Sequence, residues 1–176
     1  MKKFLIVVDM QKDFVDGALG TNEAQAIVEN VARKIEGFDG GIIVTYDTHG
    51  EDYMQTAEGR KLPAPHCIKG TPGWQLNARV EAALAGKHCT RIEKPSFGSV
   101  ELPQVVGRLA GGEDFTAEFV GLCTDICVVS NALLVKASYP EMELYVDASC
   151  CAGVTPATHE AALTTMRSCQ INVIGE

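Results

Sequence analysis

Six short runs rich in branched apolar residues recur along the chain, and helix-like segments separate most of them. The runs are Phe4–Val8, Gly41–Tyr46, Cys89–Ile92, Phe115–Leu122, Met142–Val146 and Ile171–Ile174. The helix-like segments, judged by apolar spacing, are Asn22–Glu36, Gln75–Ala85, Val100–Ala110, Asp125–Ala137 and Pro156–Arg167. Strands that alternate with helices are typical of a parallel sheet covered on both faces. We therefore predict a three-layer α/β fold, in which a six-stranded, mostly parallel sheet lies between two layers of helices.

The length and composition of the chain limit its domain count and its partners. With 176 residues, 46% of them hydrophobic, the chain is long enough for one large core and short for two. We predict a single domain over residues 1–176. The 15 Lys and Arg against 23 Asp and Glu give a net charge of −8, spread along the chain. That balance argues against nucleic acid or an anionic membrane as a partner, and favours a small molecule or another protein.

The start of the chain, MKKFLIVV, superficially resembles a signal peptide. Its apolar run, Phe4–Val8, ends at Asp9 and is too short for that role, and no stretch of membrane-spanning length follows. The seven cysteines are an odd number without framework-like spacing, which suits reduced thiols. We expect a cytoplasmic protein.

Reactive or charged side chains follow five of the six predicted strands. In chain order they are Asp9, Asp47, Lys94, Cys127 and Asp147. Ligands of open α/β sheets bind in the crevice outside the carboxyl ends of the strands. Each residue alone has an ordinary explanation, such as a helix cap, a turn or a solvated surface group. Their shared edge favours a functional site instead.

Cys127 lies near the start of a predicted helix, which Thr124 or Asp125 can cap. Backbone amides and the helix dipole stabilise a thiolate there, although a free cysteine is more often a small buried hydrophobe. Asp9 is the available proton carrier, and Lys94 is the available counter-charge. A lysine close to both Asp9 and Cys127 would favour the anionic forms of these two residues. The other histidines outside the long loop, His88 and His159, are badly placed for a Cys-His pair, so we expect them to be structural or exposed.

The long segment from Thr48 to Thr71 has little periodicity, which is typical of a functional loop. Asp47 and His49 point the same way in an extended chain, and His66 follows nineteen positions after Asp47. Two His and one carboxylate with open positions suit Zn²⁺, Fe²⁺ or Mn²⁺, and Glu58 is a candidate fourth ligand. A D-x-H pair alone is a weak signal, because such pairs are frequent and a hydrogen-bonded loop explains them more simply.

Several motifs together carry a family resemblance. They are LIVVDMQKDF (residues 5–14), TYDTH (45–49), PAPHCIKGTPGW (63–74), the isolated Lys94 and GLCTDICV (121–128). Over nearly its whole length the sequence resembles the isochorismatase-like cysteine hydrolases, and among them the nicotinamidases. G-x-x-T-D-x-C-V after a strand is quite specific for this superfamily. D-x-H followed by P-H-C-x-x-G-T-P-G separates nicotinamidases from many metal-free relatives.

The resemblance implies a Rossmann-like fold and a set of site residues. The implied catalytic triad is Asp9, Lys94 and Cys127, and the implied metal ligands are Asp47, His49 and His66. Glu58 is similar in placement to a glutamate ligand of some members. The resemblance also implies a cis peptide bond between Leu122 and Cys123, with the amides of Cys123 and Cys127 forming an oxyanion hole.

The implied substrate slot departs from the family pattern. Phe97 stands where a Tyr is common, and Leu62 or Pro63 replaces an aromatic residue, so the slot would consist of Phe14, Leu62 and Phe97, with Trp74 as a further candidate. The implied reaction converts nicotinamide to nicotinate and ammonia through a thioester, in NAD salvage. The family further implies one divalent metal ion, with zinc the first choice and iron or manganese as alternatives, and a homo-oligomer.

Three other functions are compatible with parts of the sequence. A related hydrolase acting on another small amide would keep the same residues. Cleavage of a vinyl ether needs neither a metal nor a cysteine nucleophile, so Cys127 and the D-x-H loop count against it. A catalytically silent interaction module, with the nearly all-apolar segment Ile126–Val135 serving assembly, conflicts with the presence of the complete triad and of all three ligands.

Overall fold

The computed structural model describes residues 1–176 and contains one six-stranded sheet. Its strands are β1 (Lys2–Val8), β2 (Gly41–Asp47), β3 (Cys89–Lys94), β4 (Phe115–Leu122), β5 (Glu143–Ala152) and β6 (Asn172–Ile174). They lie in the order β3-β2-β1-β4-β5-β6, and every neighbouring pair is parallel. The predicted parallel sheet is confirmed. All six predicted strands exist, and β1 lies in the middle of the sheet, where both faces are buried.

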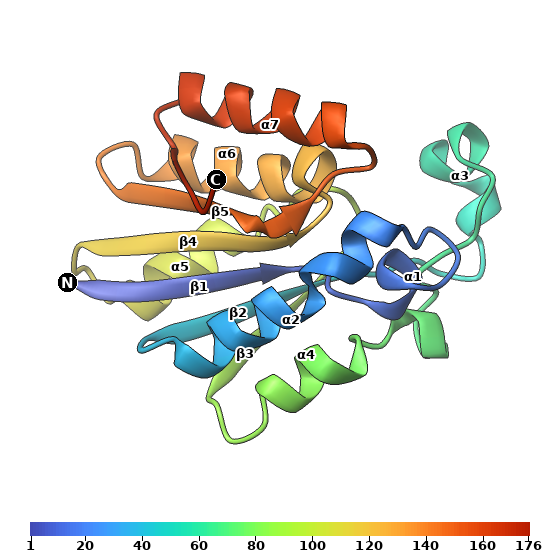
Figure 1. Cartoon of the computed structure of the whole chain (residues 1–176), viewed down its shortest axis with the longest axis horizontal. Coiled ribbons are helices and arrows are strands. Elements are labelled where there is room, and N and C mark those ends of the chain that lie inside the picture. The colour runs from blue at the N-terminus through green and yellow to red at the C-terminus, as the bar shows by residue number, and fades with distance from the viewer.

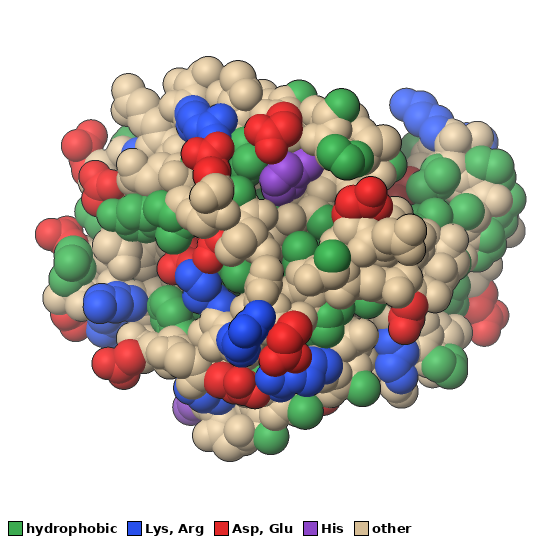
Figure 2. All heavy atoms as spheres, in the orientation of Figure 1, with side chains coloured by type: hydrophobic (Ala, Val, Ile, Leu, Met, Phe, Trp, Pro, Cys, Tyr) green, Lys and Arg blue, Asp and Glu red, His purple; other side chains and the backbone are tan.

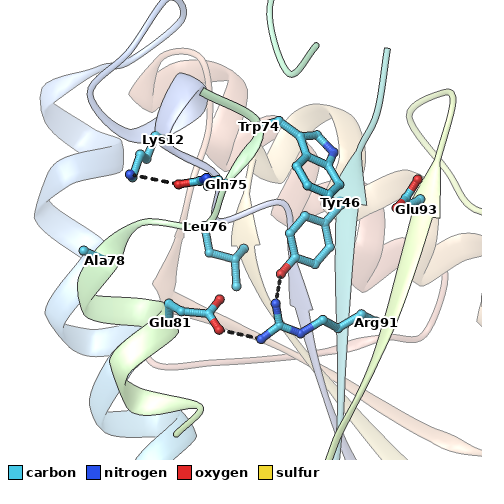
Figure 3. Close-up of a pocket in the computed structure, with 9 residues that line it drawn as sticks. All are labelled: Lys12, Tyr46, Trp74, Gln75, Leu76, Ala78, Glu81, Arg91 and Glu93. Carbon is cyan, nitrogen blue, oxygen red and sulfur yellow. Dashed lines mark hydrogen bonds and ion pairs between the residues drawn. The ribbon is translucent and has the colours of Figure 1, made fainter. Parts of the chain in front are cut away.

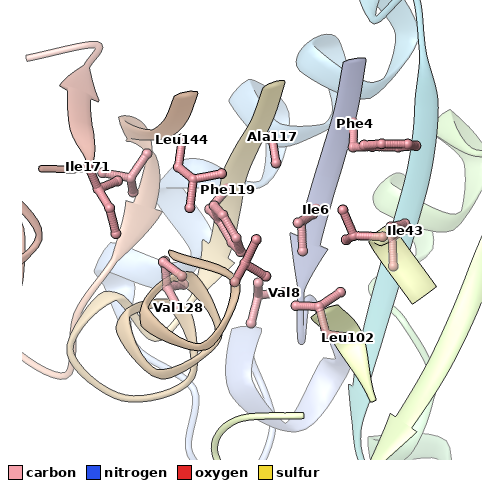
Figure 4. Packing of buried hydrophobic residues seen from close by; sticks show 14 of the residues in the cluster. Phe4, Ile6, Val8, Ile43, Leu102, Ala117, Phe119, Val128, Leu144 and Ile171 are labelled. Carbon is pink, nitrogen blue, oxygen red and sulfur yellow. The ribbon is translucent and has the colours of Figure 1, made fainter. Parts of the chain in front are cut away.

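Helices cover both faces of the sheet (Figure 1). One layer contains α2 (Asn22–Gly37) and α4 (Ala78–Ala83), and the other contains α5 (Leu102–Ala110), α6 (Val129–Ser138) and α7 (Pro156–Ser168). Alternate residues of β1 supply the two cores, because successive side chains of a strand point to opposite faces. Phe4, Ile6 and Val8 belong to the cluster under α5, α6 and α7 (Figure 4), whereas Leu5 and Val7 belong to the cluster under α2 and α4.

The connections at the carboxyl ends of the strands contain short helices that periodicity did not reveal. They are α1 (Lys12–Val15), η1 (Tyr53–Gln55), α3 (Ala57–Lys61) and η2 (Pro72–Trp74). The predicted functional loop thus contains one-turn helices, which are too short to show a repeating apolar pattern. The helix predicted over Gln75–Ala85 begins later, because the side chain of Asn77 caps α4 by accepting from the amide of Arg79.

β5 is longer than predicted, and this changes the place of Asp147. The register between β4 and β5 shifts after Phe119, so that Gly121 pairs with Cys151 and β5 continues to Ala152. Asp147 therefore lies inside the strand, where its Oδ2 contacts Lys34 Nζ at 2.7 Å. The prediction that Asp147 joins the polar residues at the carboxyl edge is wrong.

The face of the molecule that α2 and α4 cover carries acidic and basic side chains interspersed with one another (Figure 2). Between these two helices, Arg79 pairs with Glu29 at 2.9 Å and with Glu36 at 2.7 Å. No helix of the chain combines the length and apolarity needed to cross a bilayer.

Candidate active site

Three sheet connections bring the predicted catalytic residues together. Asp9 follows β1 directly and adopts a left-handed backbone conformation, with φ of +48°. Lys94 is the last residue of β3. Cys127 lies in a π-helical turn, Thr124–Val128, between β4 and α6. Lys94 and Cys127 are 33 positions apart in the sequence, and Asp9 is farther from both. The carboxyl ends of the parallel strands bring the three residues to one place.

Lys94 is the centre of this group. Its Nζ lies 2.6 Å from Asp9 Oδ2 and 3.4 Å from Cys127 Sγ, and donates to the carbonyl of Ser96 at 2.9 Å. The hydroxyl of Thr45 donates to Asp9 Oδ1 at 2.6 Å. Asp9, Lys94 and Cys127 are all buried. The structure therefore brings together the three residues that the sequence suggested for catalysis.

Burial dominates the protonation of the site. Burial and the charge of Asp9 raise the pKa of the Cys127 thiol well above its ordinary value, and the opposing charge of Lys94 is too weak to reverse this. Burial also raises the pKa of Asp9, against the lowering effect of Lys94. Burial therefore opposes the thiolate that a lysine and a helix start were expected to favour at Cys127. Attack by Cys127 requires a base to take its proton, and Asp9 is adjacent.

The nucleophile turn is anchored from both sides. The peptide bond between Leu122 and Cys123 is cis, as the family resemblance implied. Thr124 Oγ1 and His159 Nδ1 are 2.8 Å apart, which ties the turn to α7. His159 has the structural role that we expected. The turn is of π type where the sequence predicted an α-helix from Asp125, a local geometry that is frequent at functional sites.

Asn131 is a site residue that the sequence did not reveal. Its side chain is fully buried and accepts from the amide of Ser99 at 2.9 Å. It donates to the carbonyls of Cys127 at 2.8 Å and Phe97 at 3.2 Å. Asn131 therefore joins the segment after Lys94 to the nucleophile turn. The available signal was an amide side chain within the nearly all-apolar segment 126–135.

Beside this group, Asp47, His49, Glu58 and His66 form a cluster whose ligand atoms all lie within 4.8 Å of one another. Asp47 Oδ2 lies 3.0 Å from His49 Nε2 and 3.4 Å from His66 Nε2. Glu58 Oε1 lies 3.8 Å and 3.6 Å from the same two nitrogens. Asp47 Oδ1 is 3.5 Å from Lys94 Nζ, so the cluster adjoins the catalytic group.

The chemistry of the cluster fits a divalent metal ion. His66 Nδ1 lies 2.8 Å from the carbonyl of Ala64 and can only donate to it, which leaves the Nε2 lone pair free for a metal. Burial raises the pKa of Asp47, but the close contacts with His49 and His66 and the charge of Lys94 outweigh it and lower the pKa, so Asp47 is ionised. Two imidazoles and two carboxylates suit Zn²⁺, Fe²⁺ or Mn²⁺.

Gln11 holds Asp47 in place through its main chain. The Gln11 amide donates to the Asp47 carbonyl at 2.8 Å and accepts from the Asp47 amide at 2.8 Å. Gln11 is completely buried. The role of Gln11 could not be predicted from the sequence, because nothing in the motif LIVVDMQKDF shows that its side chain reaches across to β2.

A cavity of about 450 Å³ opens next to the metal cluster, and His49, Glu58, Leu62, Ser96 and Phe97 are among its lining residues. Phe97 and Leu62 are 44% and 41% exposed, so they lie at its mouth. Phe14 is half-buried, with its ring centroid 5.4 Å from that of His66. Of the three predicted slot residues, Leu62 and Phe97 line this cavity, whereas Phe14 contacts His66 of the metal cluster.

Trp74 does not line this cavity. It lines a different one, together with Tyr46 and Arg91 (Figure 3). The suggestion that Trp74 completes the substrate slot is therefore not supported, because its indole packs beside Tyr46 and donates to the hydroxyl of Thr48.

The sequence profile of the Isochorismatase domain matches residues 3–175. The chain belongs to the isochorismatase family. Within the family it is 27% identical to the nicotinamidase/pyrazinamidase of Mycobacterium tuberculosis, with 97% of each chain covered. The family resemblance that the motifs indicated is confirmed.

Solved structures of family members agree with this assignment. The nicotinamidase/pyrazinamidase of Bacillus subtilis superposes with a TM-score of 0.84 at 26% identity, covering 99% of this chain and 100% of the other. The pyrazinamidase of Pyrococcus horikoshii, whose structure contains zinc, superposes with a TM-score of 0.82 at 26% identity, covering 100% of both chains. This isochorismatase-family chain is an amidohydrolase.

Proposed function

We propose that this amidohydrolase converts nicotinamide to nicotinate and ammonia, with Cys127 as the nucleophile and Asp9 as the proton carrier. The observation that carries the proposal is the position of Lys94, which contacts Asp9 and Cys127 and lies 3.5 Å from Asp47 of the metal cluster. A pyridine carboxamide has a ring nitrogen that a metal ion in the cluster could bind, and an amide carbon that Cys127 could attack. The similarity to nicotinamidases and pyrazinamidases supports the same substrate class.

The protein residues can carry the reaction in two stages. Asp9 takes the proton of the Cys127 thiol, and the sulfur attacks the amide carbon to give a tetrahedral intermediate. The backbone amides of Cys123 and Cys127 donate to its oxyanion. Collapse breaks the C–N bond and gives a thioester, and the departing nitrogen takes the proton from Asp9 to leave as ammonia. Asp9 then removes a proton from water, which attacks the thioester and releases nicotinate and the thiol.

Lys94 stays protonated through this cycle in our proposal. Burial lowers the pKa of Lys94, but the charges of Asp9 and Asp47 outweigh it and raise the pKa above its ordinary value. Its positive charge stabilises whichever of Asp9 and Cys127 is anionic.

The metal cluster would position the substrate. Asp47, His49, His66 and Glu58 would hold one divalent ion, with zinc the first choice, and the bound ion supplies a Lewis acid that can bind a pyridine nitrogen. Phe14, Leu62 and Phe97 would enclose the ring. In this proposal the reaction serves NAD salvage, and the enzyme is a cytoplasmic homo-oligomer with a single domain.

A second candidate function is hydrolysis of a different small amide. The observation that favours it is the exposure of Phe97 and Leu62 at the cavity mouth. Phe97 lacks the hydroxyl that a Tyr would supply there, and Leu62 lacks an aromatic ring. The catalytic steps would be the same, and only the fit of the ring would differ.

The decisive experiment is release of ammonia from nicotinamide by the zinc-loaded protein, with Cys127→Ala and Cys169→Ala alongside. Cys169 is an exposed free cysteine and serves as the matched control. We expect release by the wild type and by Cys169→Ala, and none by Cys127→Ala with unchanged circular dichroism. Substantial turnover by Cys127→Ala would remove Cys127 as the nucleophile. Turnover of other small amides but not of nicotinamide would favour the second candidate.

A further inference from the structure

A second cavity, of about 560 Å³, lies on the sheet face covered by α4, near the edge strand β3 (Figure 3). None of the proposed catalytic residues or metal ligands lines it. Its nine lining residues are Lys12, Tyr46, Trp74, Gln75, Leu76, Ala78, Glu81, Arg91 and Glu93. Its volume is within the range of about 300–1,000 Å³ that small-molecule sites occupy.

Two aromatic rings and an aliphatic side chain form the apolar part of this cavity. The ring centroids of Tyr46 and Trp74 are 5.4 Å apart, with the planes inclined at 40°. Leu76, which is 4% exposed, lies beside them. Aromatic surfaces of this kind favour a planar ring as their ligand, because offset stacking adds to the burial of apolar area.

The polar part of the cavity carries balanced charge. Arg91 pairs with Glu81 at 2.6 Å and donates to the hydroxyl of Tyr46 at 2.5 Å. Lys12 donates to Gln75 at 3.4 Å, and Glu93 pairs with Lys69 at 2.6 Å. The two cationic and two anionic lining side chains cancel, which disfavours a strongly charged ligand. They offer both donors and acceptors to the edge of a neutral ring.

We propose that this cavity is a second ligand site, which binds a neutral planar heteroaromatic molecule of about nucleoside size. The ring would stack against Trp74, and its edge would face Glu81 and Arg91. A single six-membered ring would leave much of the volume empty, whereas a purine with an attached sugar fits the range for such sites. This inference goes beyond the amidase reaction and does not depend on which amide is cleaved.

The site is connected to the metal cluster by direct bonds. Tyr46 immediately precedes Asp47, and the indole of Trp74 donates to the hydroxyl of Thr48 at 2.9 Å. The amide of Gln11 donates to the carbonyls of Asp47 and Trp74, each at 2.8 Å. A molecule bound against Trp74 is therefore connected, through the Gln11 side chain, to the main chain of Asp47, which is one of the proposed metal-binding residues. Because coupling between two sites is reciprocal, we expect a metal ion held at Asp47 to change the affinity of the second site.

Trp74 is the single tryptophan of the chain, so its fluorescence reports on this cavity directly. The experiment is titration of the full-length, metal-free protein with adenosine, a neutral purine nucleoside, while tryptophan emission is recorded. We expect a saturable change with a midpoint below about 1 mM. No saturable change up to about 10 mM overturns the proposal.

Two matched variants locate the binding. Ala78 and Ala57 are exposed first residues of the short helices α4 and α3, and each lines one of the two cavities. Ala78→Phe fills the second cavity and should weaken adenosine binding at least about tenfold, whereas Ala57→Phe should leave the titration unchanged. The reverse pattern places the nucleoside in the cavity beside the metal cluster and overturns the proposal. Ala78→Leu replaces Ala78→Phe if the larger side chain prevents folding.

The same titration after zinc loading tests the connection through Gln11 and Thr48. We expect the adenosine midpoint to shift at least about fivefold between the metal-free and zinc-loaded protein. Equal midpoints would overturn the coupling and leave the binding site itself established by the two alanine variants. Neither readout uses turnover, so failure here is distinguishable from failure of the proposed amidase.

Discussion

The ammonium group of Lys94 lies 2.6 Å from the carboxylate of Asp9, and neither side chain has measurable exposure to solvent. Two charges buried this deeply lose their hydration, and each is tolerated only because the other is present. The pair holds a proton acceptor and a fixed positive charge beside Cys127. It therefore has a stability consequence as well as a catalytic one, and the two can be measured separately.

Replacing Lys94 with Met should abolish turnover and destabilise the protein. The substitution leaves the Asp9 carboxylate buried without its counter-charge, which costs about 3–5 kcal/mol in the free energy of unfolding. The double variant Asp9→Asn with Lys94→Met removes both charges and should recover most of that stability without recovering activity. Urea denaturation of the three proteins measures this. A single variant as stable as the wild type would contradict the buried-pair interpretation.

Replacing His49 with Ala should remove bound metal. His49 Nε2 is one of two imidazole nitrogens in the cluster, and even residues that only support a metal ligand commonly change affinity 10–100-fold, so we expect a loss of at least about tenfold. Glu58→Gln should have a smaller effect, since Glu58 Oε1 lies farther from both histidines than Asp47 does. Metal content after dialysis is the measurement, and His88→Ala is the control on an exposed histidine. Unchanged zinc in His49→Ala would remove this residue from the ligand set.

Chelation gives an independent test of the same cluster. Treatment with a chelator should abolish ammonia release, and added zinc should restore it in the wild type but not in His49→Ala. Activity that survives complete metal removal would show that the four residues have a structural role only.

Replacing Asn131 with Leu should loosen the segment that carries Phe97. The change leaves the amide of Ser99 and the carbonyl of Cys127 without their partner, at about 1–3 kcal/mol for each buried group. We expect reduced unfolding free energy together with a raised KM for the amide. Asn30→Leu is the control, because the bond from Asn30 to the carbonyl of Ser149 is exposed and water can replace it. A KM equal to that of the wild type would show that Asn131 supports the core alone.

Acid should remove the stabilisation that Asp147 provides. Burial raises the pKa of Asp147, but hydrogen bonds from Lys34 and Ser149 outweigh it and the net pKa is lowered. A lowered folded-state pKa means that the unfolded chain binds the proton more tightly, so this contribution is complete above about pH 4 and is lost as the pH falls further. Asp147→Asn should cost about 1.5–3 kcal/mol at pH 7. The difference from wild type should shrink with acidification; a difference that is the same at pH 7 and pH 3 would contradict this assignment.

Much of the site was accessible from sequence because it depends on strand ends. Asp9, Asp47 and Lys94 each end or follow a strand, and parallel pairing brings such ends to one edge. Asp147 broke the same rule, because the register shift between β4 and β5 moves the end of β5 to Ala152. An apolar run ending in Asp looks the same whether or not the strand continues through it.

The parallel sheet, its two helical layers and the set of residues able to do chemistry were all predictable from the sequence. Those features follow from apolar periodicity and from the residue types placed at strand ends, which are local properties of the chain. Only the three-dimensional arrangement shows that Trp74 lines a second cavity, that Asn131 joins the segment after Lys94 to the Cys127 turn, and that burial raises the pKa of the Cys127 thiol. The physical reason is that burial, desolvation and hydrogen-bond partners depend on what distant segments bring to a side chain, and no local pattern records those neighbours.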